Sequence, residues 1–216
     1  MNKLSLTKDG SHTLWSEQAK ENYHSVFGAI QESRHIFIQA GLQVFSYKTE
    51  PVNILEIGLG TGLNALLSFQ WSEENNIPVD YFAIEAYPLD ISIIKKLNYP
   101  EILSISKQTF FSIHQKNKEK IGSFFSFQMQ EIMLETYSPK RNFFDLIYFD
   151  AFSPDVQPEM WTETNFRKLY NSLKPGGFMV TYSTKGTVKR ALKSVGFKIE
   201  KLPGPPGKRE FLRAKK

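Results

Sequence analysis

The sequence predicts an α/β protein built on a doubly wound, mostly parallel sheet with an antiparallel C-terminal hairpin. Apolar strand segments alternate with helical segments from residue 51 onward, which is the pattern of successive βαβ units. A glycine turn at residues 58–62 follows the first of these strands and opens a helix. Two closing strands, 197–201 and 210–214, flank a short loop rich in Pro and Gly, which predicts the edge hairpin.

The individual elements follow from apolar runs bounded by Gly and Pro. Strands are expected at residues 52–57, 79–85, 124–129, 144–150 and 178–182. Helices are expected at residues 25–41, 63–74, 89–98, 100–113, 162–173 and 187–195. Pro175-Gly176-Gly177 is expected to end the helix at 162–173. Residues 1–50 are interpreted as a short N-terminal extension that packs on a main domain at residues 51–216.

Composition excludes several functional classes. The 216 residues are 41% hydrophobic and 23% charged, which is typical of a folded single domain. The absence of cysteine excludes disulfides, zinc–thiolate sites and cysteine nucleophiles, and the four histidines lack metal-ligand spacing, so no metal is expected. No signal segment and no run near the ~18 apolar residues of a membrane span are present, so we expect a cytoplasmic protein without membrane contact.

Positive charge is concentrated at the C-terminal end. Residues 184–216 hold 11 Lys and Arg against 2 Asp and Glu, whereas residues 1–183 hold 16 against 20. Such a patch neutralises phosphates, so it predicts contact with a nucleic acid. A solvated, lysine-rich surface without a partner is the alternative interpretation.

The glycine turn predicts a ribose-bearing cofactor at the carboxyl edge of the sheet. Its glycines allow a tight turn and close approach of a ligand. The spacing is G-x-G-x-G, and Leu63 stands where a dinucleotide fingerprint has a glycine. Glu85, at the end of the next strand, can accept hydrogen bonds from both hydroxyls of a ribose. A turn that only connects a strand to a helix is the alternative.

The glycine turn and Glu85 together resemble the class I S-adenosylmethionine-dependent methyltransferases. The resemblance implies that residues 56–62 surround the methionine part of the cofactor and that Glu85 holds its ribose. The adenine would lie beside the turn after strand 124–129, where this chain has Gln130 and Glu131 instead of the Asp that the class often has. The expected cofactor-binding residues are Glu56, Gly58, Gly60, Gly62, Asn64, Glu85, Ala86, Gln130 and, from the N-terminal extension, Glu32.

A second motif, FDLIYFDAFSP, brings Asp150 to the same edge of the sheet. Pro154 and Pro158 stiffen the loop that follows, up to Trp161. Methyl transfer from a sulfonium mainly requires an aligned nucleophile, and an amine must lose its proton to attack. A buried Asp150 can orient such an amine and accept its proton. A loop-capping role for Asp150 is the alternative.

Further segments resemble the methyltransferase domain of the bacterial MnmC family of tRNA wobble-uridine modification enzymes. These segments are residues 23–38, the DAFSP and PEMW stretch at 150–161, TVKRAL at 187–192 and PGPPGKRE at 203–210. The resemblance covers the chain from about Thr13 to its end. It implies methylation of 5-aminomethyl-2-thiouridine at the anticodon wobble position, with Asp150 as the catalytic residue and Glu32 in a segment that closes over the cofactor pocket.

The resemblance also implies contacts to a tRNA anticodon arm. A wobble base lies in a loop, so it can be splayed out and stacked on aromatic side chains, although these aromatic residues have core packing as an alternative role. The expected substrate- and tRNA-binding residues are Phe152, Pro154, Trp161, Tyr182, Lys185, Lys189, Arg190, Lys208 and Arg209.

The chain departs from the family pattern in two places. It ends at Lys216, without the flavin oxidoreductase domain of two-domain members, so we expect the stand-alone form, no flavin, and an upstream enzyme that supplies the aminomethyl group. Its proline-rich loop at residues 203–206 replaces a loop richer in glycine and aromatic residues.

Two other functions remain as alternatives. An aminopropyltransferase would need an acidic substrate pocket, and the basic C-terminal end argues against that. A non-catalytic tRNA-binding protein of this fold is disfavoured by the intact set Glu56, Gly58, Gly60, Glu85 and Asp150.

Overall fold

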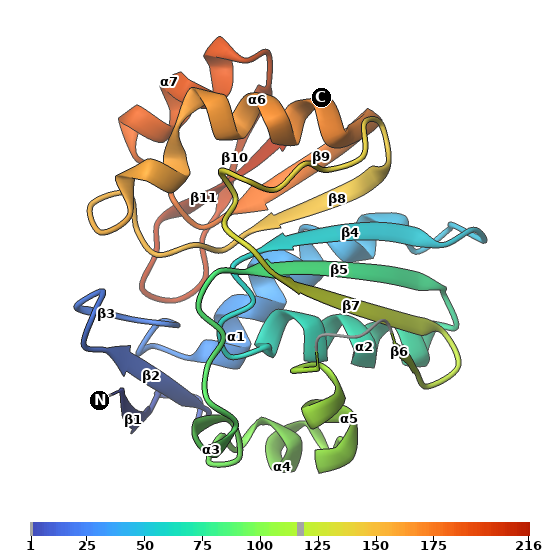
Figure 1. The fold of residues 1–216 in the computed structure, drawn as a ribbon, viewed down its shortest axis with the longest axis vertical. Coiled ribbons are helices and arrows are strands. Elements are labelled where there is room, and N and C mark those ends of the chain that lie inside the picture. Colours follow the sequence, from blue (N-terminus) through green and yellow to red (C-terminus); the bar gives the residue numbers. More distant parts are fainter. Residues whose placement is uncertain (1, 116–118) are drawn as a thin grey trace.

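The computed structural model describes residues 2–115 and 119–216, and an eight-stranded sheet forms its centre (Figure 1). The strand order is β10-β11-β9-β8-β4-β5-β7-β6. The five inner strands from β9 to β7 are parallel, and their bounds are Val52–Ile57 (β4), Val79–Glu85 (β5), Phe125–Glu131 (β7), Phe144–Phe149 (β8) and Leu173–Thr181 (β9). Their carboxyl ends therefore meet at one edge of the sheet.

Antiparallel strands close both sides of the sheet. β10 (Lys198–Pro203) and β11 (Glu210–Lys215) form a hairpin, and β11 pairs with β9. This confirms the hairpin and the sheet type predicted from the sequence. On the opposite side, the short strand β6 (Glu119–Ile121) pairs with β7 and was not predicted.

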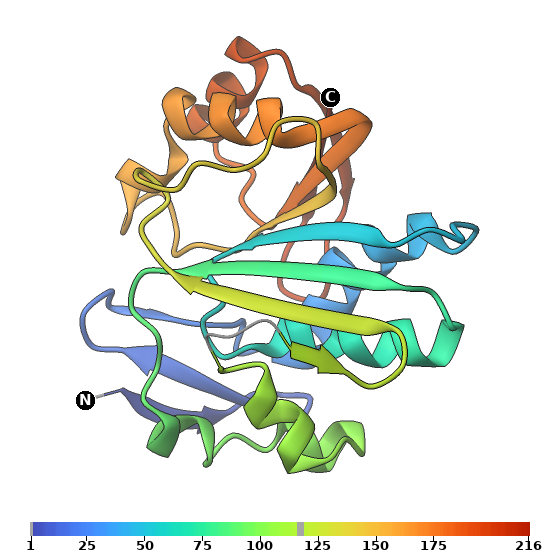
Figure 2. The same ribbon diagram turned by 45° about the vertical axis from the view of Figure 1, so that its right-hand side comes forward.

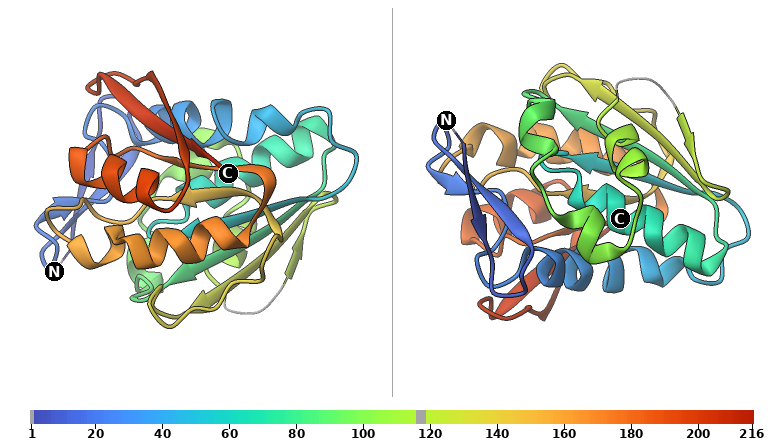
Figure 3. Two further views of the ribbon diagram at one scale, coloured as in Figure 1. Left: turned by 90° about the horizontal axis from the view of Figure 1, so that it is seen from above. Right: turned by 90° about the horizontal axis from the view of Figure 1, so that it is seen from below.

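Helices cover both faces of the sheet (Figure 3). α1 (Ala29–Ser33), the π-helical turn η1 (Arg34–Gln39) and α2 (Leu63–Asn75) cover one face, while α6 (Glu163–Ser172) and α7 (Gly186–Ser194) cover the other. Successive strand residues point to opposite faces, so Tyr148 joins one buried cluster and Ile147 the other. Both faces being buried explains why the inner strands are almost continuously apolar.

The predicted helices at 89–98 and 100–113 are wrong in extent. α3 covers only Ile91–Ile94, and the second helix is divided into α4 (Tyr99–Leu103) and α5 (Lys107–Ser112). Ser104 adopts a left-handed conformation with φ 54°, which ends α4. Ser106 then caps α5 by accepting a hydrogen bond from the Thr109 amide.

The helix predicted at 162–173 is observed as α6, but the strand after it begins earlier than predicted. β9 starts at Leu173 and includes Pro175-Gly176-Gly177. A register shift between β8 and β9 accommodates these residues, because the extra backbone bulges out of the ladder.

The N-terminal residues form a separate small sheet that the sequence did not reveal. β1 (Lys3–Leu6), β2 (His12–Ser16) and β3 (Glu21–Asn22) pair antiparallel and lie at the side of the molecule where the parallel strands end (Figure 2). All four residues of β1 are exposed, so no alternating apolar pattern marks it. The helix predicted at 25–41 is observed as α1 and η1, and the 3₁₀ helix η2 (Leu42–Phe45) follows.

Within the described part of the chain, none of the helices combines the length and the apolar character that a membrane crossing requires.

Asp145 in β8 connects β4 and β9 of the main sheet with the N-terminal extension. Its carboxylate lies 2.8 Å from the ammonium groups of both Lys48 and Lys174 and accepts a hydrogen bond from the Asn53 amide. Burial raises the pKa of Asp145, but the hydrogen bonds from Lys174, Lys48 and Asn53 outweigh it and hold the pKa below 3.8. The stability from these bonds is present above pH 3.8 and is lost as the pH falls through the lowered value.

We predict that Asp145→Ala lowers the free energy of unfolding by about 3 kcal/mol at neutral pH, because it leaves two half-buried cations without their anion. Urea denaturation measures this. Glu101→Gln is the control: its pair with Lys107 is more than half exposed on both sides, so its loss costs under about 0.5 kcal/mol. Equal losses in the two variants would contradict the assignment.

Candidate active site

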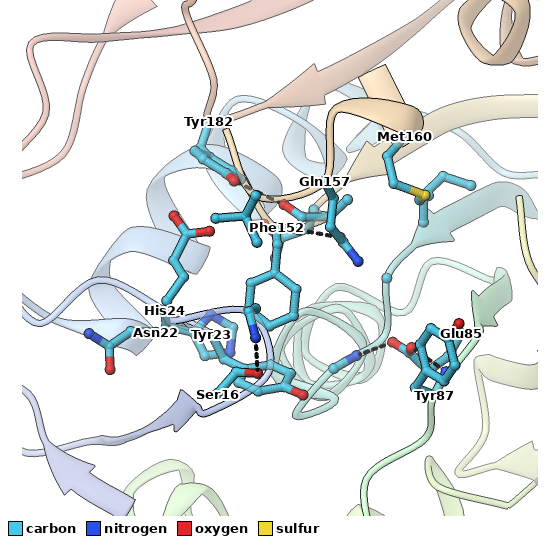
Figure 4. A pocket seen from close by; sticks show the side chains of 18 of the residues that line it. Ser16, Asn22, Tyr23, His24, Glu85, Tyr87, Phe152, Gln157, Met160 and Tyr182 are labelled. Carbon is cyan, nitrogen blue, oxygen red and sulfur yellow. Dashed lines mark hydrogen bonds between the residues drawn. The ribbon is translucent and has the colours of Figure 1, made fainter. Parts of the chain in front are cut away.

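A cavity of about 880 Å³ opens at the carboxyl edge of the parallel strands (Figure 4). Its size lies within the range of roughly 300–1,000 Å³ that small-molecule sites occupy. Its walls come from the carboxyl ends of β4 and β5 and the residues after them, and from Glu32 and segment 16–27 of the N-terminal extension. Residues from 132–135, 150–160 and 207–208 and the side chain of Tyr182 complete them.

The glycine turn forms the floor of this cavity between β4 and α2. Gly58 and Gly60 line it and have positive φ angles of 85° and 51°. A Cβ atom on Gly58 would lie 2.9 Å from the backbone oxygen of Asp150, so only glycine lets these two segments approach. Gly62 also has a positive φ but packs against His114 and does not line the cavity.

Glu85, the last residue of β5, stands at the rim beside the turn. Its Oε2 accepts a hydrogen bond from the Gly60 amide at 3.0 Å, and its Oε1 accepts one from the Tyr87 amide at 2.9 Å (Figure 4). Each oxygen keeps a second lone pair, so the fixed carboxylate can still accept two ribose hydroxyls. Ala86 lines the cavity next to it. These residues therefore fit an adenosyl cofactor.

Asp150 lies directly after β8, on the opposite side of the glycine turn from Glu85. Its amide donates to the Ile57 carbonyl at 3.0 Å, and its Oδ2 accepts from the Asn64 amide group at 2.8 Å. Burial raises the pKa of Asp150 to about 7, with smaller effects from Asn64, Glu32 and Lys208. A carboxylate that titrates near neutral pH in a cavity is suited to accept a proton.

Besides Gly62, three other expected cofactor-binding residues lie outside the cavity wall. Glu56 and Asn64 are buried behind Asp150, and the Asn64 amide group donates to Glu56 Oε1 at 3.0 Å. Burial raises the pKa of Glu56 well above its usual value. Gln130 is exposed near the end of β7, and Ile132, Met133 and Leu134 stand at the wall instead.

Lys208 and Glu32 reach the cavity from opposite ends of the chain and pair there. The Lys208 ammonium lies 2.6 Å from Glu32 Oε2 and 4.3 Å from the centroid of the Tyr182 ring. The Tyr182 hydroxyl donates to the Ala151 carbonyl at 2.9 Å, so this cluster borders the loop that carries Asp150. The sequence predicted a phosphate contact for Lys208, whereas the structure places its ammonium in the cavity wall.

The aromatic residues predicted to stack on a base occupy different positions. Phe152 lines the cavity and packs edge to face against Tyr23, with 4.9 Å between the ring centroids. Trp161 is buried against Phe149 and donates its indole N–H to the Phe152 carbonyl, so it supports the loop from behind. Pro154 does not line the cavity.

The remaining predicted cations lie outside the cavity wall. Lys185 and Lys189 stand at the beginning of α7, and Lys185 pairs with Asp155 of the loop after β8. Arg190 and Arg209 are exposed.

Several cavity residues were missed by the sequence analysis because they directly follow β3 of the unrecognised N-terminal sheet. Tyr23 has its pKa raised to about 12 by burial and by the Glu85 charge. His24 Nε2 lies 2.6 Å from the Thr61 hydroxyl of the glycine turn, and burial lowers the pKa of His24 to about 4. The only sign in the sequence that these residues belong to the site was their position in segment 23–38, which resembles the MnmC family.

Over residues 2–115 and 119–216, no three His, Asp or Glu side chains gather in a way that would hold a metal ion.

We predict that Gly58→Ala abolishes binding of S-adenosylhomocysteine, because the new Cβ displaces the Asp150 backbone and distorts the cavity floor. Gly176→Ala is the matched control: its φ of 79° imposes a similar strain of about 1 kcal/mol, but no atom lies within 4 Å of its Cβ. Calorimetric titration measures binding, and thermal unfolding measures the shared strain. Normal binding by Gly58→Ala would contradict the role of the close approach.

Two kinds of comparison with known sequences agree on the family. A sequence model of the S-adenosyl-L-methionine-dependent methyltransferase family matches residues 107–216. The bifunctional protein MnmC of tRNA 5-methylaminomethyl-2-thiouridine biosynthesis from Actinobacillus pleuropneumoniae is 31% identical over 232 residues. That match covers 96% of this chain and 34% of the relative, so the chain spans about a third of the length of the curated relatives it matches.

Solved structures agree with the fold. The crystal structure of MnmC2 from Aquifex aeolicus matches 99% of this chain and 69% of that chain, with a TM-score of 0.83 and 25% identity. Spermidine synthase from Thermotoga maritima matches with a TM-score of 0.57 and 15% identity over 100% of this chain and 71% of that chain, which shows a shared fold alone. Since the family match extends over half of the sequence, the chain belongs to the S-adenosyl-L-methionine-dependent methyltransferases.

Proposed function

We propose that this chain methylates the primary amine of 5-aminomethyl-2-thiouridine at the wobble position of tRNA, giving 5-methylaminomethyl-2-thiouridine. The observation that carries the proposal is Asp150, a half-buried carboxylate that lines the same cavity as the glycine turn and Glu85. The biosynthesis named for the MnmC relative ends in this methylated amine, which supports the choice of substrate.

The chain's residues divide the cavity between cofactor and substrate. Glu85 would hold the ribose, the backbone of Gly58 and Gly60 would face the methionine part, and the apolar side chains of residues 132–134 would contact the adenine. The bound cofactor supplies an activated methyl group on a sulfonium. The Asp150 side of the cavity is then left for the methyl acceptor, with Phe152 and Tyr182 beside it.

Asp150 prepares the acceptor for an in-line attack. An aminomethyl group arrives mainly as an ammonium ion, which has no free electron pair. Asp150 pairs with this ammonium and accepts its proton, so that the nitrogen lone pair forms the new N–C bond while the S–C bond breaks. The immediate products are the protonated secondary amine and the neutral thioether, and the proton held by Asp150 is released to solvent before the next turnover.

The charge of the cavity suits cationic reactants. Its wall includes the carboxylates of Glu21, Glu32, Glu85 and Asp150, and Lys208 is the single Lys or Arg among the described residues that line it. Such a negative site attracts both the sulfonium and the substrate ammonium.

The tRNA would contact the surface around the mouth of the cavity. Lys185 pairs with Asp155 of the loop that lines it, so the basic start of α7 adjoins this mouth, and Lys189 and Arg190 extend the positive charge along the helix. Residues 1–50 would act as a cover over the cavity of the main domain at 51–216. The acceptor amine is made by a separate activity, because methyl transfer does not create the aminomethyl group.

We predict that Asp150→Asn lowers kcat by roughly 10²-fold or more while the affinity for S-adenosylhomocysteine changes little. In the wild type, kcat/KM rises with pH through about 7, because Asp150 must be ionised to accept the proton. The assay uses tRNA bearing 5-aminomethyl-2-thiouridine, followed by nucleoside mass spectrometry. Full turnover by Asp150→Asn, or product from putrescine and decarboxylated cofactor instead of tRNA, would overturn the proposal.

We predict that the double substitution Lys189→Gln and Arg190→Gln weakens tRNA binding and reduces the dependence of log Kd on log salt by about 2, since each lost phosphate contact removes about one unit. Filter binding over a range of salt concentrations measures both effects. Lys95→Gln with Lys96→Gln, which removes two exposed cations beside α3, is the matched control. Equal effects of the two pairs would mean that total charge, and not this surface, binds tRNA.

A further inference from the structure

Behind Asp150, two polar side chains, Asn64 and Glu56, form a buried pair that does not line the cavity. Asn64 is 2% exposed and Glu56 is fully buried, and neither lines the cavity. The Asn64 amide nitrogen donates to Asp150 Oδ2 at 2.8 Å and to Glu56 Oε1 at 3.0 Å. Its two hydrogens are therefore both committed to carboxyl groups of this chain.

These groups are brought together by strands and a helix, and not by a long loop. Glu56 and Tyr148 lie opposite each other in β4 and β8, and Asp150 follows two residues after Tyr148. Asn64 stands in the first turn of α2, directly beyond the glycine turn. The bond from Asn64 to Asp150 thus connects a rigid helix to the residue that leaves β8.

We propose that Asn64 is a positioning residue: its amide, held from behind by Glu56, fixes one oxygen of Asp150 and leaves the other facing the methyl acceptor. This rests on the function proposed above for Asp150. Throughout residues 2–115 and 119–216, no side chain or backbone group donates a hydrogen bond to Asp150 Oδ1. That oxygen is therefore available for the ammonium of the substrate.

The charges around the group support this division of roles. Burial, offset in part by Asn64, raises the pKa of Glu56 well above its usual value and favours its neutral form. The Asn64 hydrogen bond also opposes the effect of burial on Asp150 and favours its ionised form. The other charged or titratable groups facing Asp150 are Glu32, Lys208, Tyr182 and Tyr81.

Asn64 acts through Asp150, so its role differs from the cofactor contact expected from the sequence. A cofactor ligand would need a polar atom at the cavity wall, whereas both hydrogens of the Asn64 amide point to carboxyl oxygens. Loss of a cofactor ligand would weaken cofactor binding. Loss of a positioning residue would instead lower kcat and move the ionisation of Asp150.

The test compares Asn64→Leu, which has a similar volume and no donor, with Asn64→Ser, which keeps one donor. For Asn64→Leu we expect kcat at pH 7 to fall by about 10- to 100-fold, the acid limb of kcat/KM to move to higher pH, and the Kd of S-adenosylhomocysteine to stay within about threefold of wild type. Asn64→Ser should lie between Asn64→Leu and wild type. In an Asp150→Asn background, Asn64→Leu should have little further effect on turnover.

Asn165→Leu is the control for loss of a buried amide. Asn165 is also 2% exposed, and its amide donates to the Glu159 and Met160 carbonyls, away from Asp150. This variant should lose stability to a similar degree without moving the titration of Asp150.

The ionisation of Asp150 can be followed without any substrate. Carbon NMR of protein labelled at the aspartate carboxyl carbons, with Asp150→Asn identifying the signal, should show a higher pKa in Asn64→Leu than in wild type. An unchanged titration together with weakened S-adenosylhomocysteine binding would overturn the proposal and assign Asn64 to the cofactor. A shifted titration in a protein that does not methylate aminomethyluridine would retain the positioning role and reject the substrate instead.

Discussion

The parallel pairing of β4 with β5 on one side and β8 on the other fixes the geometry on which the site depends. Ile57 lies opposite both Ile84 and Phe149, so Glu85 and Asp150 each follow at the same level, on either side of the glycine turn. Two backbone hydrogen bonds continue this pairing beyond the strands, from the Gly58 amide to the Ile84 carbonyl and from the Asp150 amide to the Ile57 carbonyl. The two carboxylates are therefore separated by sheet geometry and not by flexible loops.

The N-terminal extension forms the part of the cavity wall that the ends of the parallel strands leave open. It contacts both sides of the cavity. On the side of the glycine turn, the His24 ring is hydrogen-bonded to the Thr61 hydroxyl. On the side of the Asp150 loop, Tyr23 packs against Phe152, and Glu21 accepts a hydrogen bond from the Ser153 amide. Burial raises the pKa values of two carboxyl groups at this end of the sheet, Glu56 and Asp150. The neutral form of Glu56 is favoured, whereas the pKa of Asp150, raised to about 7, lets it exchange a proton near neutral pH.

The sequence revealed the parts of the fold that have strong periodicity. β4 and β5 begin and end where predicted, because buried parallel strands are short apolar runs bounded by Pro and Gly. The N-terminal sheet escaped prediction, since β1 is exposed throughout and β3 has two residues. Within the site, the positions of Glu85 and Asp150 could be predicted because each lies at the end of a predicted strand. The position of Lys208 could not be predicted in this way. Its pairing with Glu32 joins residues 176 positions apart, and local sequence carries no sign of such a contact.

The central claim is that one cavity holds the cofactor between Glu85 and Asp150. A crystal structure with S-adenosylhomocysteine tests it most directly. The account requires the ribose hydroxyls on the Glu85 carboxylate, the homocysteine over Gly58 and Gly60, and the sulfur facing the side of the cavity where Asp150 lies. A ligand bound elsewhere, or in this cavity with its sulfur turned away from Asp150, would contradict the account.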